Sequence, residues 1–74
     1  MENNPPPYTL IFKRNNYNFE VDYAETVGEA FDLLEFYKTL VSHMGLRILT
    51  DVWPGFYVYT NDHEELGEYY IKED

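Results

Sequence analysis

Cysteine is absent from this 74-residue chain, and serine occurs only once, at Ser42. Without cysteine, the chain forms neither disulfides nor thiolate metal sites. Basic residues are also scarce: 5 Lys and Arg stand against 14 Asp and Glu, for a formal net charge of −9. DNA, RNA and anionic membranes carry the same sign of charge and are therefore disfavoured as partners. The charge balance favours a basic partner, unless the acids serve solubility alone.

Long hydrophobic runs are also missing, and the longest apolar stretches fall far short of a membrane span. The N-terminal segment MENNPPPY has neither the basic region nor the apolar run of a signal peptide. We therefore expect a cytoplasmic protein.

Aromatic residues are abundant, with eight Tyr, five Phe and one Trp in a chain that is 45% hydrophobic. Large rings bury much area per residue, so a chain of this length can build one core but not two. Pro5, Pro6 and Pro7 cannot join a helix or a central strand. We predict a Pro-rich N-terminal tail at residues 1–7 and a single α+β domain at residues 8–74.

Residues 8–23, YTLIFKRNNYNFEVDY, alternate as expected of a β-hairpin. A two-residue turn at Asn15 and Asn16 would set the register, because Asn tolerates positive φ. The inner face then consists of apolar or aromatic cross-strand pairs: Phe12 with Phe19, Leu10 with Val21, and Tyr8 with Tyr23.

The TVGE segment predicts a capping box between Thr26 and Glu29, at the start of a helix from about Val27 to Met44. Gly45 is well placed to end this helix in the left-handed conformation. Phe31 and Phe36 lie on opposite flanks of the apolar stripe, as core margin or as an interface. The stripe expected to face the sheet consists of Ala30, Leu33, Leu34, Tyr37, Leu40, Val41 and Met44.

Two more strands are predicted at residues 46–52 and 56–60, joined by a type II bend with Gly55 at positive φ. Residues 62–66 are expected to form a short helical turn that Gly67 breaks. Residues 68–73 favour a fifth strand, with a short terminal helix as the alternative. The fold class is therefore α+β, with order ββαββ and an added β: an antiparallel sheet of four to five strands covered on one face by one helix.

The sequence offers few residues in an arrangement suited to catalysis. Ser42 and His43 are neighbours on the predicted helix, where their side chains point about 100° apart and cannot pair. Residues 62–65 (Asp-His-Glu-Glu) lack the i, i+4 spacing of a helical metal site, so a solvated turn is favoured. The four glycines are scattered and offer no phosphate cradle. We expect no enzyme activity, no cofactor and no metal.

The acidic residues fall into clusters along the predicted elements. Glu20 and Asp22 would stand roughly 7 Å apart on the outer face of a strand. Glu25, Glu29 and Asp32 would follow one side of the helix at intervals of roughly 5 to 6 Å. These spacings are comparable with those of DNA phosphates, and nearby tyrosines would add contact area. The candidate partner-binding residues are Glu20, Asp22, Glu25, Glu29, Asp32, Asp62, Glu64, Glu65, Glu68, Tyr69 and Tyr70.

In its size, acidic clusters, lack of cysteine and aromatic content, the chain resembles the small acidic proteins with which bacteriophages disable host DNA-binding proteins. The resemblance includes no shared motif, so no residue role is carried over. Some of those proteins mimic DNA and occupy histone-like nucleoid proteins, restriction enzymes, repair glycosylases or CRISPR effectors. The resemblance implies a DNA mimic in the host bacterial cytoplasm that inhibits a basic DNA-binding protein, foremost a histone-like nucleoid protein.

The alternative function is a general protein-interaction module or antitoxin-like partner. Such a module would bind through a hydrophobic flank and use its acids for solubility. Salt separates the two hypotheses, because an electrostatic mimic weakens steeply with ionic strength. We also expect a homodimer, since a small core leaves Phe31, Phe36 and strand edges available for contact.

Overall fold

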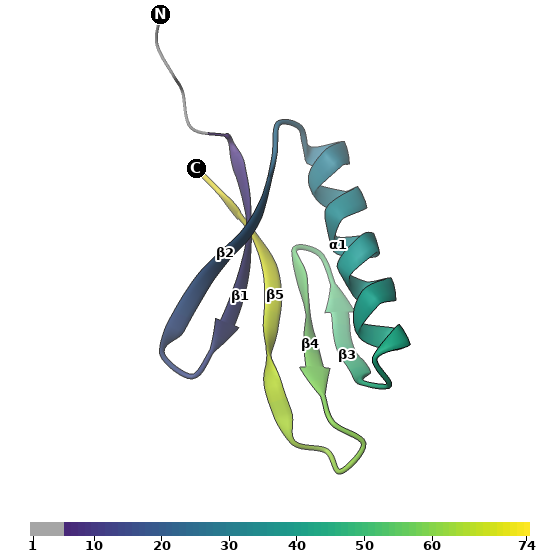
Figure 1. The fold of residues 1–74 in the computed structure, drawn as a ribbon. Helices are drawn as coiled ribbons and strands as arrows, with labels where there is room; N and C mark the ends of the chain where they lie inside the picture. Colours follow the sequence, from purple (N-terminus) through teal and green to yellow (C-terminus); the bar gives the residue numbers. More distant parts are fainter. Residues whose placement is uncertain (1–5) are drawn as a thin grey trace, which may run out of the picture.

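The computed structural model describes residues 6–74 as one helix packed on one face of a five-stranded antiparallel sheet (Figure 1). The predicted α+β class and the fifth strand are confirmed. The predicted tail lies largely outside the described residues, and Pro7 already accepts a hydrogen bond from the backbone N–H of Asp74 (2.9 Å). The elements are β1 (Tyr8–Arg14), β2 (Tyr17–Ala24), α1 (Val27–His43), β3 (Arg47–Val52), β4 (Gly55–Tyr59) and β5 (Glu65–Glu73).

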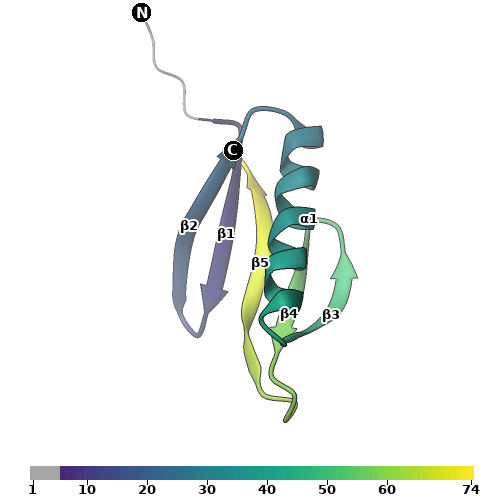
Figure 2. The ribbon, with the colours of Figure 1, turned by 45° about the vertical axis from the view of Figure 1, so that its right-hand side comes forward.

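The C-terminal strand lies in the middle of the sheet, whose order is β2-β1-β5-β4-β3. Strand β5 therefore joins the β1–β2 hairpin to the β3–β4 hairpin by pairing with β1 on one side and β4 on the other. Helix α1 contacts all five strands and lies over β5 and β4 in Figure 2. The core beneath it includes Leu10 and Phe56, both fully buried.

The hairpin register is correct near the turn and wrong beyond it. Phe12 pairs with Phe19 as predicted, but a β-bulge at Val21 shifts the pairing, so that Leu10 faces Asp22 and Tyr8 faces Ala24. A bulge adds one residue to one strand and redirects the side chains that follow it. Phe19 is also not buried, because 53% of its surface remains exposed.

Both helix ends form as the sequence predicts. The hydroxyl of Thr26 accepts the backbone N–H of Glu29 at 3.1 Å. The Glu29 carboxylate in turn accepts the backbone N–H of Glu25 at 3.0 Å, one residue before the N-cap. At the C-terminal end, Gly45 takes a positive φ of 81°. Capping therefore fixes where this helix begins and ends.

The apolar stripe of α1 only partly faces the sheet. Ala30, Leu34 and Val41 are buried, and Leu33 and Tyr37 pack against the core. Leu40 and Met44 are instead exposed. The last turns of the helix thus leave an apolar flank uncovered.

Two turn predictions are wrong. The peptide bond between Trp53 and Pro54 is cis, and Gly55 does not have positive φ. Gly55 is required for another reason: a Cβ there would collide with the carbonyl oxygen of Tyr69 on β5. Residues 62–66 form no helical turn, because Thr60 closes this loop with backbone hydrogen bonds to His63 and Glu64.

Gly67 does not break the chain but lies inside β5. A Cβ at this position would lie 2.6 Å from both the Phe12 ring and the carbonyl oxygen of Lys13. The glycine therefore lets the Phe12 ring lie directly against the strand.

No helix within residues 6–74 is long and apolar enough to cross a membrane.

Candidate partner-binding surfaces

Acidic residues gather at the end of the molecule where α1 begins. Tyr8 pairs with Ala24 on one side and Glu73 on the other, so the C-terminus lies two strands away from the β2–α1 junction. Figures 1 and 2 both show the C-terminus and this junction at the same end. We call this region the acidic end; it consists of Asp22, Glu25, Glu29, Asp32, Glu73 and Asp74.

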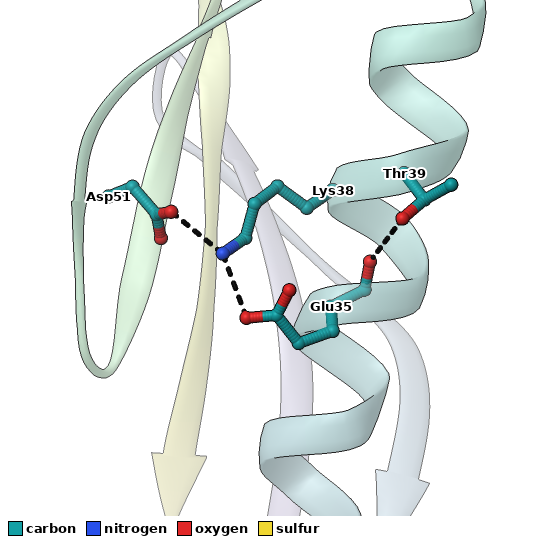
Figure 3. A network of polar contacts seen from close by, with 4 residues as sticks. All are labelled: Glu35, Lys38, Thr39 and Asp51. Carbon is teal, nitrogen blue, oxygen red and sulfur yellow. Dashed lines mark hydrogen bonds and ion pairs between the residues drawn. The ribbon is translucent and has the colours of Figure 1, made fainter.

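Within residues 6–74, no residue of the acidic end forms an ion pair. The ion pairs in this part of the chain are those of Lys38 with Glu35 (2.9 Å) and with Asp51 (2.7 Å) (Figure 3). The hydrogen bond to Asp51 raises the pKa of Lys38. The N-terminus of α1 offsets some of the negative charge through its own positive dipole end, but this effect is limited to the first turn.

The predicted strand pair does not form one surface. The bulge at Val21 places Glu20 opposite Ile11 and Asp22 opposite Leu10. Ile11 and Leu10 are adjacent in β1, so their side chains point to opposite faces of the sheet. Glu20 accepts a hydrogen bond from the Tyr23 hydroxyl (2.8 Å), which raises the pKa of that phenol. Glu20 therefore does not belong to the acidic end.

The acids of residues 62–68 lie toward the opposite end of the molecule. Glu65 and Glu73 bound β5, and eight residue steps of strand separate them by about 26 Å. This distance exceeds the Debye length of about 8 Å at physiological ionic strength, so the two groups act independently. Asp62 and Glu64 are exposed in the β4–β5 loop. Glu65 and Glu68 line one pocket with Lys13, where a cation weakens their field.

The two predicted tyrosines have different environments. Tyr69 faces the helix and packs against the rings of Phe12 (4.7 Å between centroids), Phe56 (5.3 Å) and Tyr37 (5.6 Å). Burial raises the pKa of Tyr69. This ring is partly buried and packs against the core, so less of it is available to a partner than the sequence suggests. Tyr70 lies on the other face, opposite Ile11 and Gly55.

The helix-free face of the sheet combines tyrosines with bases. Alternation places Lys13, Arg47 and Lys72 on this face, three of the five Lys and Arg residues in the chain. The same register places Glu20, Glu65 and Glu68 on this face, so its bases are matched by acids. Sequence reasoning missed this arrangement, because it follows only from the strand register. Its tyrosines are Tyr23, Tyr57, Tyr59 and Tyr70.

Exposed apolar side chains occur on both flanks of α1. On one flank, Phe36, Leu40 and Met44 follow each other at intervals of four residues. We call these three the outer helix flank. Phe36 contacts Tyr37 edge-on, and Tyr37 stacks on Tyr69, so the flank continues into the aromatic core. On the other flank, Phe31 stacks on Trp53 at 6.1 Å.

No reactive constellation forms among the residues the structure describes. Ser42 and His43 line a shallow pocket with Lys38 and Thr39 on α1, and no hydrogen bond joins Ser42 to His43. No group of three or more His, Asp or Glu residues in 6–74 is arranged to hold a metal ion. These surfaces offer charge and apolar contact area.

A scan against protein-family models, a search of curated proteins and a search of solved structures each found no match to this chain. A functional assignment therefore depends on the surfaces described above.

Proposed function

We propose that this protein binds a basic DNA-binding protein through the acidic end and excludes DNA from it. The observation that carries the proposal is that six acids share one end of the fold, and none of them forms an ion pair within residues 6–74. Such a surface attracts a cationic partner, because nothing within the described chain competes for its charge.

The expected energetics suit a cluster better than a single residue. An exposed ion pair contributes about 0.2 to 1 kcal/mol, so six acids together contribute roughly 1 to 6 kcal/mol. Most of this attraction acts before contact, since steering raises the association rate. Single substitutions at the acidic end should therefore have small effects, and combined ones should have large effects.

The outer helix flank would supply apolar contact area, which the charges of the acidic end do not provide. Phe36 is one turn beyond Asp32 on α1, so a partner held at the acidic end meets this ring. Buried aromatic anchors lower dissociation rates more than they raise association rates. Charge would steer the encounter, and the ring would prolong the complex.

The second candidate function is an interaction module in which apolar contact dominates. It is favoured by the exposed large apolar side chains on the helix flanks, among them Phe36 (60% exposed) and Met44 (67%). In this case binding would strengthen or stay constant as salt is added, whereas the mimic would weaken.

The test is competition between this protein and a labelled DNA duplex for a purified histone-like nucleoid protein. Combining Glu25→Gln, Glu29→Gln and Asp32→Asn should weaken competition about tenfold, by losing three exposed pairs. The matched control combines Asp62→Asn, Glu64→Gln and Glu65→Gln, which removes the same charge at the other end. This control should compete nearly as well as the parent protein.

Two results would count against the proposal. If both triple variants lose competition equally, net charge matters and the acidic end is not the binding surface. If neither triple variant loses competition, the DNA-mimic proposal is wrong. A loss of binding in Phe36→Ala would then favour the interaction module. The parent protein should show no affinity for the duplex itself.

A further inference from the structure

A second apolar surface lies on the flank of α1 that faces β3. It consists of Val27, Phe31, Val52 and Trp53, and we call it the β3-side patch. Each of its side chains is about half exposed or more, from 45% for Trp53 to 69% for Val52. The Phe31 and Trp53 rings stack at 6.1 Å with an interplanar angle of 27°, so the helix and the β3–β4 turn present one continuous surface.

The charge around this patch differs from that of the rest of the molecule. Glu35 follows Phe31 by one turn of α1, and Asp51 precedes Val52 on β3. Lys38 binds both carboxylates, at 2.9 and 2.7 Å, and bridges the helix to the strand (Figure 3). These three residues together carry a formal charge of only −1, whereas the whole chain carries −9.

The neighbouring strand is an edge of the sheet. Strand β3 pairs with β4 on one side only, so its outer backbone groups are available. Its register is interrupted between Leu49 and Val52, where Thr50 has a φ of 52°. Such an irregularity limits open-ended strand addition but leaves room for a closed contact between side chains.

We propose that the β3-side patch is a self-association surface whose occupant is the same patch of a second copy of this chain, related by a twofold axis. A twofold contact brings like surfaces together, which two strongly acidic chains tolerate best where their local charge is low. The Lys38 bridge lowers the charge to −1 here, and helical spacing turns the side chains of Glu29 and Asp32 away from that of Phe31. A basic partner has no reason to prefer this flank, since its carboxylates already have a cation.

The size of the patch sets the strength of the dimer. Aromatic side chains bury 150 to 250 Å² when fully covered, so this half-exposed set offers roughly 400 Å² of apolar surface per protomer. Stable complexes bury about 800 Å² per partner. The dimer is therefore weak, in the micromolar range or above, and it strengthens with salt because screening reduces the repulsion between the chains.

Sedimentation equilibrium over micromolar to millimolar protein, at low and high salt, tests this proposal. Phe31→Ala should raise the dimer dissociation constant about tenfold or more, as expected for a central aromatic contact. Phe36→Ala is the matched control, because it truncates the same ring type on the opposite flank of the same helix and should leave dimerisation unchanged. Circular dichroism of both variants confirms that each is folded.

Trp53 provides an independent reading, because it is the only tryptophan in the chain. Its emission should shift to the blue as the parent protein is concentrated, and the shift should disappear in Phe31→Ala. A parent protein that stays monomeric at high concentration and high salt would overturn the proposal. So would dimerisation that Phe36→Ala abolishes and Phe31→Ala leaves intact. Neither result bears on DNA competition at the acidic end.

Discussion

Phe12 and Phe19 are paired across the β1–β2 hairpin but contribute unequally to the core. Phe12 is half-buried, lies 4.7 Å from the ring of Tyr69 and covers Gly67. Phe19 remains 53% exposed at the edge of the sheet. The alternation of apolar and polar residues predicts that both rings lie on one face of the sheet. It does not show that α1 covers only part of that face.

Truncation of these two rings should therefore have different effects on stability. Phe12→Ala should lower the free energy of unfolding by about 3 kcal/mol, because it removes a ring from the packed aromatic cluster. Phe19→Ala should cost about 0.5 to 1 kcal/mol, the size of one cross-strand pair. Urea denaturation of both variants measures the difference. Equal losses would show that Phe19 is as well packed as Phe12.

At the scale of helices and strands, the sequence patterns that act over a few residues predicted the structure best. The Thr26–Glu29 cap, Gly45 and the turn at Asn15 and Asn16 act within a few residues, so the sequence alone locates them. The bulge at Val21 left no such trace, since the alternation of Phe19, Val21 and Tyr23 continues through it. Its consequence was large, because it separated Glu20 from Asp22 in the candidate site.

Strand order also escaped sequence reasoning for a physical reason. The sequence predicts a fifth strand at residues 68–73 but not its place in the sheet. In the structure β5 spans residues 65–73 and is the central strand, where Gly67 and Ile71 are buried and Tyr69 packs against the core. Central position depends on contacts with β1 and β4 that are distant in the sequence. The same pairing brings Glu73 to the acidic end and packs Tyr69 against the core.

The contribution of the N-terminal cap of α1 to stability can be measured by mutation. Thr26→Ala should reduce the free energy of unfolding by about 1 kcal/mol, because the backbone N–H of Glu29 loses its acceptor. Thr39→Ala is the control: its hydroxyl bonds the Glu35 carbonyl (3.0 Å), which already has helical partners. This second change should be neutral or slightly stabilising, since Ala favours a helix. A control as unstable as Thr26→Ala would argue against capping as the cause.

At the scale of the whole molecule, charge separates by region. The helix-free face holds three bases together with Glu20, Glu65 and Glu68, the Lys38 bridge lowers the charge of the β3 flank to −1, and the acidic end is left without ion pairs among residues 6–74. The composition alone shows the excess of acids but not this division. Because of this division, one small chain presents both a charged surface and an apolar surface.

Salt should therefore act in opposite directions on folding and on partner binding. Repulsion among unpaired acids opposes the compact state, and the Debye length falls from about 30 Å at 0.01 M to about 3 Å at 1 M salt. Screening removes more repulsion than attraction, because Lys38 alone makes ion pairs within the described residues. We expect the free energy of unfolding to rise on the order of 1 kcal/mol over this range. Urea denaturation at low protein concentration, with increasing sodium chloride, measures this rise. Urea is uncharged, so the denaturant itself does not change the ionic strength.

The variant that combines Glu25→Gln, Glu29→Gln and Asp32→Asn separates the electrostatic part of this effect. Sodium chloride also strengthens apolar burial slightly, and that contribution is the same in both proteins. The variant has less repulsion to screen, so its unfolding free energy should start higher and rise less with salt. In the competition assay the same variant should lose most of its salt dependence, because salt weakens the attraction that those three carboxylates provide. Equal salt slopes for the variant and the parent, in folding and in binding, would show that the acidic end contributes to neither.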